Sequence, residues 1–549
     1  MSAPRPRPVP ARLLERALAA PDSPLCVVPE RVLDGGLPVD GQIGWWRVTV
    51  GEAALQVAAL ADALETAGVV ASDRVGVLAG SSHTWAVLDL AIQALGAITV
   101  GLSPELGVEE LRRRLALTGA RLLVTDRTVA IPGVTRLGMP GTPGTPLQPG
   151  TAPDLDRLAA RLSAIDVDQP AALAFTAGTT APARAATLSH NALYQAVVAG
   201  RNAFDTKAGD RSVVALPMDH IHQRFATYAG TDQGIEGWYP RHTGHLPDTF
   251  RAARPHLLVA SPAVLEDIRL AARARAVERG FGGLFDWACQ PREQRRGWRA
   301  RAEREIADHM VFRRIRRGLG GHLRSIVAGG APLSVALAGW FARVGIPVRD
   351  GWGLVETGAP LTASTGPGEG VGRPLPGVRV RVADSGELEV DAPSVMSGYH
   401  GDPAATARAF TPDGWLRTGD WGWVDRNGQV HLGGRLSDRL PGPEVLDLGE
   451  VDGRLSVPGG RWVVTCPARA AVGLVAFSFR PRSGDSVSSQ NSLRQAILNW
   501  NHARGTGQRI VKLACIDATP TVTDGTCTPT LAPVREAIYD RYHGLLETF

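Results

Sequence analysis

Residues 51–130 alternate short apolar runs with stretches of helical periodicity, and this rhythm constrains the fold more than any other feature of the chain. Val75–Leu78, Ala97–Leu102 and Arg121–Val124 have the length and apolar character of buried strands. Trp85–Leu95 and Val108–Thr118 lie between them and carry apolar residues at helical spacing. Strands separated by helices are typical of a parallel sheet with crossover connections. We therefore expect an α/β fold in which large mixed or parallel sheets are flanked by helices.

The pattern changes in the second half of the chain. Residues 262–319 form a long, Arg-rich helical segment. From Val378 onward, short strands alternate with turn signals such as Thr411–Gly414 and Asp425–Gly428, which predicts a β-rich subdomain. The last hundred residues predict a small α+β unit, with strands near 461–466, 472–479 and 510–516 and helices at 492–504 and 532–546.

Composition narrows the class of protein. The chain has 549 residues, too many for one core, with 44% hydrophobic and 21% charged residues, as in ordinary globular proteins. No stretch of about 18 apolar residues occurs and the N-terminus does not resemble a signal peptide, so we expect a cytoplasmic protein without a membrane span. The five cysteines are scattered and never at C-x-x-C spacing, which supports neither a disulfide framework nor a zinc site.

The charge balance is mildly basic, with a net charge of +5. An excess of this size suits a small polyanionic substrate, and it falls short of the clustered basic face that nucleic-acid binding requires. The densest cluster, Arg292–Arg304, alternates with Glu and Ala and is interpreted as a solvated helix face. We therefore expect a small-molecule partner and no nucleic acid.

One loop carries the strongest chemical signal. Phe175 to Arg184 reads Phe-Thr-Ala-Gly-Thr-Thr-Ala-Pro-Ala-Arg and follows the apolar run Ala171–Phe175. Small residues allow the backbone to approach a polyanion, and successive N–H groups can then point at it. Threonine hydroxyls and Arg184 add further donors. The loop lacks the Gly-Lys-Ser/Thr ending of a Walker A motif, and taken alone it is either a phosphate-binding loop or an ordinary turn.

Four further segments turn this loop into a pattern. They are Ala328–Ser334 (Ala-Gly-Gly-Ala-Pro-Leu-Ser), Gly351–Thr357 (Gly-Trp-Gly-Leu-Val-Glu-Thr), Gly414–Asp420 (Gly-Trp-Leu-Arg-Thr-Gly-Asp) and Gly434–Asp438 (Gly-Arg-Leu-Ser-Asp). Their order and spacing resemble the adenylate-forming superfamily, and most closely its long-chain acyl-CoA synthetase branch. Leu216–Ile221, Ser394–Tyr399 and Thr528–Leu531 also fit that branch, and the resemblance runs from about residue 45 to 545.

The resemblance implies a site for ATP and Mg²⁺. The loop residues Thr176, Ala177, Gly178, Thr179, Thr180 and Arg184 would hold the phosphates, with Thr179 also near the metal. Glu356 would bind Mg²⁺, which prefers carboxylate and phosphate oxygens. Asp420 would bind the ribose hydroxyls and Arg435 the ribose or α-phosphate. The adenine would be enclosed by Gly329, Gly330, Ala331, Pro332, Trp352 and Gly353, and His220 would line the pocket of the acid substrate.

The resemblance also implies two domains, a body (residues 1–434) that binds AMP and substrate and a mobile lid (435–549) that rotates about Ser437. The lid departs from the family pattern. The family motif Thr-Pro-Thr-Leu-Lys ends in a lysine that reaches the α-phosphate, and here Ala532 takes its place. Lys512 and Arg535 are the cations considered as substitutes. The segment 439–444, which follows the junction, is shortened and contains two prolines where the family has a Gly-rich loop that supports transfer to CoA.

Three functions fit these observations. The first is an AMP-forming ligase that activates a small acid as its adenylate, with CoA as a possible acceptor. The second keeps adenylation but uses nitrite and an aryl amine, as in relatives from bacterial specialised metabolism that form a diazo group. The third is a non-catalytic homologue that binds nucleotide. The sequence leaves the acid, the acceptor and the oligomeric state open.

Overall fold

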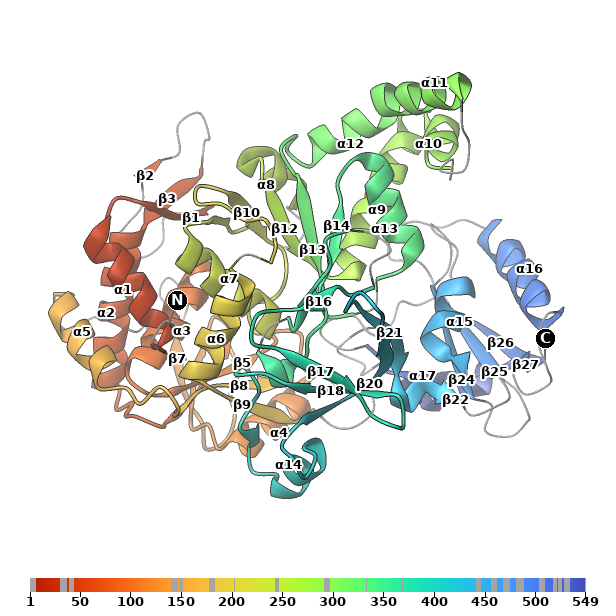
Figure 1. Cartoon of the computed structure of the whole chain (residues 1–549). Coiled ribbons are helices and arrows are strands. Elements are labelled where there is room, and N and C mark those ends of the chain that lie inside the picture. The colour runs from red at the N-terminus through yellow and green to blue at the C-terminus, as the bar shows by residue number, and fades with distance from the viewer. Residues whose placement is uncertain are drawn as a thin grey trace.

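A large body and a smaller C-terminal unit make up the chain in the computed structural model (Figure 1). The structure describes residues 6–29, 37–38, 44–139, 147, 152–176, 183–201, 203–241, 246–290, 297–331, 333–358, 360–366, 370–440, 446–455, 462–467, 474–479, 488–502, 509–516, 521, 526–527 and 534–548. Within these residues, no helix is both long and apolar enough to cross a bilayer.

The alternating segment forms the parallel sheet that its rhythm predicts. The sheet has the order β19-β9-β8-β5-β4-β6-β7, and β9 alone runs antiparallel to the other strands. Its strands are β4 (Arg74–Leu78), β5 (Ile98–Leu102), β6 (Leu122–Thr125), β7 (Thr135–Gly138), β8 (Pro170–Phe175), β9 (Ala185–Ser189) and β19 (Gly398–Tyr399). The crossover helices are α3 (His83–Ala94) and α4 (Val108–Thr118), so the prediction for residues 75–124 is confirmed.

A second sheet is also mainly parallel. Its order is β14-β13-β12-β10-β11-β1-β3-β2, and β3 alone runs antiparallel to the other strands. The strands are β1 (Pro24–Val28), β2 (Leu37–Pro38), β3 (Trp46–Thr49), β10 (Arg211–Val214), β11 (Glu236–Trp238), β12 (Leu257–Ala260), β13 (Ser325–Ala328) and β14 (Val348–Asp350). The carboxyl ends of β12, β13 and β14 therefore lie at one edge, where ligands bind in open parallel sheets.

Helices fill the space between the two sheets and carry the main core. Helices α2 (Val50–Thr66) and α7 (Ile221–Gln233) pack on the second sheet, and α3 and α6 (His190–Gly200) pack on the first. Helix α2 begins at a capping box in which Thr49 and Glu52 bond each other's backbone N–H groups. The outer helices are α1 (Val9–Ala19), α5 (Leu155–Ser163), α8 (Leu246–Ala253) and α13 (Val335–Val344).

The predicted long helical segment is a series of consecutive helices, of which α10 and α11 lie farthest from the body (Figure 1). They are α9 (Pro262–Glu278), α10 (Gly282–Ala288), α11 (Trp298–Ala307), a π-turn (Asp308–Phe312) and α12 (Arg313–Gly318). Gly280 has a φ of +78° and allows the sharp turn between α9 and α10.

The predicted β-rich subdomain is an antiparallel sheet of β17 (Arg379–Val382), β18 (Glu387–Asp391), β20 (Leu416–Val424) and β21 (Val430–Arg435). Gly414 and Gly428 have φ values of +88° and +75°, as the turn signals at these glycines require. Short elements flank it, namely β15 (Thr362–Ala363), β16 (Arg373–Pro374) and α14 (Pro403–Ala409).

The C-terminal unit is α+β, as predicted. After a hairpin of β22 (Arg439–Leu440) and β23 (Leu446–Asp447), a four-stranded sheet forms with the order β24-β25-β26-β27. Its elements are α15 (Leu448–Leu455), β24 (Trp462–Pro467), β25 (Leu474–Phe479), α16 (Ser488–His502), β26 (Ile510–Ile516), α17 (Arg535–Tyr542) and β27 (Glu547–Thr548). Helix α17 begins at Arg535, later than the predicted 532, and a 3₁₀ turn over His543–Leu545 follows it.

Candidate active site

The two ends of the predicted phosphate loop are held together at the tips of β8 and β9. The backbone N–H of Thr176 donates to the carbonyl oxygen of Arg184 at 2.9 Å, and the N–H of Arg184 donates to the Thr176 hydroxyl at 3.0 Å. These bonds extend the antiparallel pairing of the two strands and close the base of the loop. The predicted binding residues Ala177, Gly178, Thr179 and Thr180 lie outside the described residues.

Glu356 lies near the base of this loop because strand β19 and the residues before it pair with β9 and with Glu356. Residues Gly398 and Tyr399 pair with Thr187 and Ala186, and the Met396 N–H donates to the Glu356 carbonyl at 2.7 Å. The Tyr399 hydroxyl then donates to Glu356 Oε1 at 2.7 Å. Burial and the Glu356 carboxylate together raise the pKa of Tyr399 well above its usual range. Tyr399 therefore stays a neutral donor that orients the glutamate.

Arg184 connects the loop to the same tyrosine. Its guanidinium lies over the Tyr399 ring, 5.6 Å from the centroid, and its Nε is 3.7 Å from the carboxylate of Asp402. The side chain is only partly buried, so the guanidinium remains accessible to an anion. Thr176, Arg184 and Glu356, which the sequence predicts to act together, thus lie in one neighbourhood with Tyr399 between the cation and the glutamate.

Trp352, Asp420 and Arg435 form a second group. The indole Nε1–H of Trp352 donates to Asp420 Oδ2 at 2.7 Å, and Arg435 Nη1 is 3.1 Å from Oδ1. Trp352 is 5% exposed and packs in the main core, with only part of its surface available to a ligand. Asp420 and Arg435 face each other across β20 and β21, where the two residues are paired. Both carboxylate oxygens of Asp420 therefore already have a partner.

The electrostatics tie the two groups into one site. Burial raises the pKa of Asp420, while Arg435 and the Trp352 hydrogen bond oppose the rise. The negative charge of Glu356 also raises the pKa of Asp420, and Arg184 and Arg435 both lower the pKa of Tyr399. Two carboxylates and two guanidiniums thus lie within electrostatic reach of one another, a charge set that suits a polyanion bound with a cation.

The predicted adenine-binding segments meet at the carboxyl edge of the second sheet. The Gly329 N–H donates to the Ala260 carbonyl at 3.3 Å, and the Gly351 N–H donates to the Ala328 carbonyl at 2.9 Å. Gly330 has a φ of +83°, and a Cβ at this residue would lie 3.8 Å from His220 Cε1. Gly353 forms a β-bridge with Pro360. Of the other predicted residues, Ala331 follows in the same turn, and Pro332 lies outside the described residues.

His220 caps the N-terminus of α7 and stacks on a second histidine. Its ring lies 4.9 Å from the ring of His222, and its Nδ1 accepts the His222 backbone N–H at 3.3 Å. Burial and the neighbouring His222 lower the pKa of His220 to about 3, so its ring is neutral at physiological pH. The sequence predicts that His220 lines the acid pocket, but the histidine that lines the cavity described next is His222.

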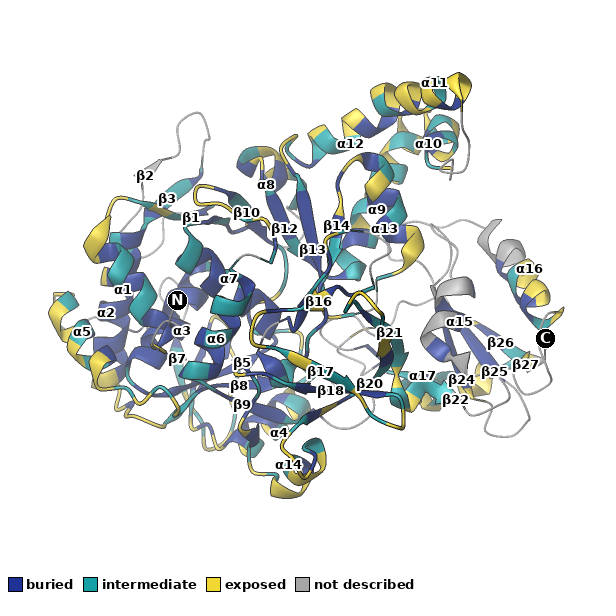
Figure 2. Ribbon diagram, in the orientation of Figure 1, coloured by how far each residue is buried: buried dark blue, intermediate teal, exposed yellow. Residues whose placement is uncertain are grey.

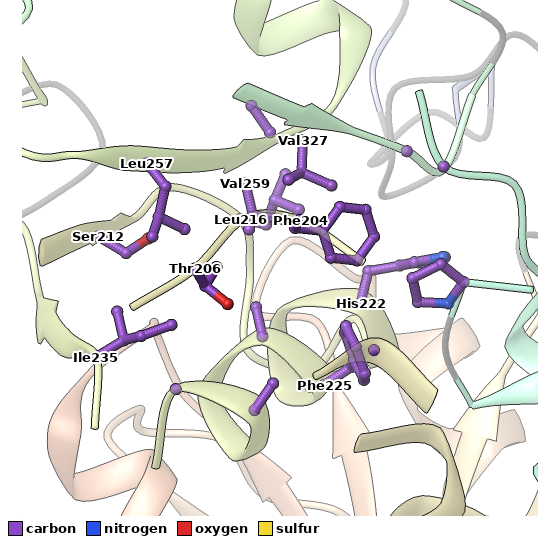
Figure 3. Close-up of a pocket in the computed structure, with 18 of the residues that line it drawn as sticks. Phe204, Thr206, Ser212, Leu216, His222, Phe225, Ile235, Leu257, Val259 and Val327 are labelled. Atoms are coloured by element: carbon purple, nitrogen blue, oxygen red, sulfur yellow. The ribbon is translucent and has the colours of Figure 1, made fainter. Parts of the chain in front are cut away.

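An apolar cavity runs between α7 and the second sheet (Figure 3). The space in it that the centre of a water molecule can occupy is about 70 Å³. One end reaches Gly329, Gly351 and Pro360 at the predicted adenine segments. From there it passes along β10, β12 and β13 to Ser212, Leu257 and Ile235. Its wall includes Phe204, Leu216, Phe225, Ala226, Ala229, Val259 and Val327.

Some residues of the candidate site could not be predicted from the sequence. Tyr399 lies in a segment that supports the resemblance, but nothing in the sequence pairs it with Glu356, 43 residues away. Asp402 and the cavity wall have no local signal at all. Conversely, Arg535 is not a free substitute for the lysine that Ala532 replaces: it lies 2.8 Å from Asp452 and 3.3 Å from Asp438. Lys512 lies within β26, paired with Val475 and Thr548, and Ala532 lies outside the described residues.

Comparison with known proteins shows the family to which the chain belongs. Residues 37–400 match the family model described as AMP-binding enzyme. The chain is 32% identical over 448 residues to the long-chain-fatty-acid–CoA ligase FadD15 of Mycobacterium bovis, covering 76% of this chain and 73% of that protein. A long-chain-fatty-acid–CoA ligase of Drosophila melanogaster, heimdall, is 26% identical over 467 residues, 73% of this chain and 66% of that one.

Two solved structures share the fold over nearly the whole chain. The o-succinylbenzoate CoA synthetase of Bacillus subtilis, bound to its acyl-adenylate, superposes with a TM-score of 0.69 at 18% identity and covers 97% of both chains. The ATP-bound MatB of Rhodopseudomonas palustris gives a TM-score of 0.69 at 21% identity, covering 97% of this chain and 99% of that one. The chain therefore belongs to the family of AMP-binding enzymes and is an AMP-forming, ligase-like enzyme.

Proposed function

We propose that the protein uses ATP to activate a fatty acid as its acyl-adenylate. The observation that carries this proposal is the apolar cavity, which opens at Gly329 and Gly351, beside the segments that would enclose adenine. A tail in this cavity would leave its carboxylate at the strand ends, where the nucleotide would lie. The similarity to long-chain-fatty-acid–CoA ligases supports the same substrate class.

The residues of the site suit ATP. The loop between Thr176 and Arg184 would bind the phosphates with backbone and hydroxyl donors and one accessible guanidinium. Asp420 already accepts a hydrogen bond from Trp352 on Oδ2 and forms an ion pair with Arg435 at Oδ1, and each oxygen has further lone pairs for a ribose hydroxyl. These two contacts would fix the carboxylate before the nucleotide arrives, which lowers the entropy cost of binding.

Glu356 would hold Mg²⁺ together with the phosphates. Among the described residues, no group of three or more His, Cys, Asp or Glu side chains is arranged to hold a metal ion. A single carboxylate shared with substrate phosphates is the usual arrangement for Mg²⁺ in nucleotide enzymes, so the donor set fits this ion. When bound, Mg²⁺ would neutralise charge on the triphosphate, and Tyr399 would keep Glu356 oriented towards it.

The chemistry then needs positioning and charge neutralisation. A carboxylate oxygen of the acid attacks the α-phosphorus, a new bond forms between them, and the bond to the bridging oxygen breaks so that pyrophosphate leaves with its electron pair. No proton is transferred in this step. Arg435 would bind the α-phosphate side and Arg184 the departing phosphates, where negative charge collects.

The cavity sets the length of the acid. Along α7 it runs from His222 to Gln233, a helix rise of about 16 Å. An extended carbon chain advances about 1.25 Å per bond, so this span accommodates roughly twelve carbons. At the far end, the Thr206 hydroxyl donates to Gln233, and this polar pair lines the cavity. An acid of medium length is therefore the expected substrate.

We propose CoA as the acceptor, by analogy with the named relatives, and residues 435–549 as the lid that rotates about Ser437 between the two steps. The Asp438–Arg535 ion pair supports this assignment, because it joins the residue after the pivot to helix α17 of the small unit. The prolines at 441 and 443 and the alanine at 532 distinguish the lid from the family pattern.

The test is pyrophosphate exchange into ATP with straight-chain acids from two to sixteen carbons. We expect a maximum at roughly twelve carbons, and in Ala229→Phe, which fills the middle of the cavity, a maximum at shorter acids. Ala196→Val, in helix α6 away from the cavity, is the control for a general packing defect. No exchange with any acid, together with AMP release that requires nitrite and an aryl amine, would replace the proposal by the diazo-forming alternative. Mg·ATP binding without turnover on any substrate would leave the non-catalytic alternative.

A further inference from the structure

The projecting helices α9 to α12 carry the positive charge of the protein. This helical arm, defined as residues 262–318, contains 14 arginines and eight aspartates and glutamates, a net charge of +6. The whole chain has a net charge of only +5, so the residues outside the arm sum to −1. A local excess of this kind attracts anionic partners at long range.

One face of the arm also exposes large apolar side chains. Trp298 is 76% exposed, Ile306 48% and Met310 41%. Val277 and Phe281, at the turn from α9 to α10, are 52% and 59% exposed. Figure 2 shows that the outer side of α11 is largely exposed. Single exposed apolar residues are ordinary, but five of them on one projecting element expose apolar surface whose contact with water is unfavourable.

Apolar and basic residues share this face. Along α11, the π-turn and α12, the exposed residues Arg299, Ile306, Met310, Arg313 and Arg317 follow one another at spacings of seven, four, three and four. Such spacing keeps side chains on one side of a helix. The buried residues Ala300, Ala307 and Val311 alternate with them, and the last two pack into the core of the body. The arm therefore has an anchored side and an amphipathic outer side.

The arginines of the outer side are available for a partner. Other arm arginines are neutralised within the arm, for example Arg273 by Asp286 at 2.8 Å and Arg316 by Asp308 at 2.6 Å. Within the part of the chain that the structure describes, Arg299, Arg313 and Arg317 form no ion pair with a carboxylate. The Arg299 guanidinium lies 5.3 Å from the centre of the Trp298 ring, so cation and aromatic ring occupy the same spot on the surface.

We propose that the arm docks the protein on an anionic lipid bilayer, with Trp298, Ile306 and Met310 at the level of the headgroups. A basic helix face that also presents Trp and aliphatic side chains is the signature of a helix that lies in a membrane interface, where apolar burial and attraction to anionic lipid add together. The interleaved aliphatic side chains favour lipid over nucleic acid, whose phosphates they cannot contact usefully. The inference stands on the arm alone and is independent of the proposed acid.

The experiment is co-sedimentation of the full chain with vesicles of phosphatidylcholine alone or with one third phosphatidylglycerol, at 0.1 M salt. We expect binding only to the anionic vesicles. Arg299→Gln/Arg313→Gln/Arg317→Gln should reduce the partition coefficient by roughly 100-fold, since each basic residue contributes roughly fivefold near an anionic surface. Trp298→Gln/Ile306→Gln/Met310→Gln keeps the charge and the helix propensity, and should also lose most binding.

The matched control removes the same charge elsewhere. Arg121, Arg408 and Arg426 are exposed, lie outside the arm and the site, and form no ion pair in the described residues. Their triple change to Gln should leave vesicle binding within a fewfold of the unmodified protein. Equal losses in both charge variants, or no binding to anionic vesicles at all, would overturn the proposal. Tighter binding of a single-stranded oligonucleotide than of vesicles, lost in the arm variant, would assign the arm to nucleic acid instead. Unchanged melting temperatures establish that the variants fold.

Discussion

Asp89 and Arg224 form an ion pair with no exposure to solvent, and removing either partner should destabilise the body strongly. Arg224 Nη2 lies 2.6 Å from Asp89 Oδ1, and its Nε lies 3.2 Å from Oδ2. Gln93 and Tyr228 also donate to the Asp89 carboxylate. The two partners join α3 to α7, and the opposite side of α7 carries Phe225 and other cavity residues. The pair thus holds the wall of the proposed acid pocket on the core.

The expected cost follows from burial. A charge left without its partner in a dry interior costs about 3–5 kcal/mol. Asp89→Asn keeps the size of the side chain and leaves the Arg224 guanidinium without its ion-pair partner. Arg224→Met leaves the Asp89 carboxylate without its partner. At about 2 °C per kcal/mol for a body of this size, each single variant should melt about 6–10 °C lower. In Asp89→Asn/Arg224→Met no buried charge remains, so the double variant should lose no more than either single one.

Thermal unfolding followed by circular dichroism measures these shifts, with urea unfolding as a second measure of the free energy. Single variants within about 1 kcal/mol of the unmodified protein would refute the claim that the pair is dry. A double variant that loses the sum of both single losses would refute the claim that each single cost is an unpaired charge. Leu55→Ala, on the exposed side of α2, is the control for an ordinary helix substitution.

Four further predictions address the site and its electrostatics. Glu356→Gln should abolish the tighter binding of a fluorescent ATP analogue in Mg²⁺ than in EDTA; an unchanged difference would remove Glu356 as the metal ligand. Trp352→Phe removes a hydrogen bond to the buried Asp420 carboxylate and should cost about 1.5–3 kcal/mol in urea unfolding, whereas no loss would mean that this carboxylate is not charged. Burial raises the pKa of Asp350 to about 7, above its unfolded value, so its ionisation lowers stability as pH rises from about 4 to 7. Relative to the unmodified protein, Asp350→Asn should gain about 2.5 kcal/mol between pH 5 and 8, and a constant difference would contradict this. Ala532→Lys should raise pyrophosphate exchange by up to about 10²–10³-fold if a cation at the α-phosphate is all that is missing, and an unchanged rate would show that another group already supplies it.

Local pattern determined much of the fold. The parallel sheet around β4, β5 and β6 follows from apolar runs spaced by helical segments, because both faces of such strands must be buried. The turns at Gly414 and Gly428 follow from a backbone conformation that glycine adopts readily. Errors arose at element ends, as in α17, which begins three residues later than predicted. End positions depend on caps and packing that a short window of sequence does not contain.

The candidate site was determined only in part by sequence. The small and hydroxylated residues at 176–184 indicated a phosphate loop by their chemistry, and the roles of 356, 420 and 435 were implied by the resemblance to the adenylate-forming superfamily. The tertiary structure decided which side chains are hydrogen-bonded to each other. Trp352 donates to Asp420, 68 residues away in the sequence, and Tyr399 donates to Glu356, 43 residues away. Such contacts depend on the register of strands from distant parts of the chain, which periodicity cannot fix.

The cavity and the arm show the same division. The sequence by itself determined that residues 262–319 are helical and rich in arginine, because composition and helical spacing are local properties. Only the folded chain decided that Trp298, Arg313 and Arg317 are exposed while Phe312 is buried. It likewise decided that Phe204, Phe225 and Val259 enclose one cavity. Burial is a property of the whole packed structure, since the same apolar side chain serves as core, pocket wall or docking surface according to what lies against it.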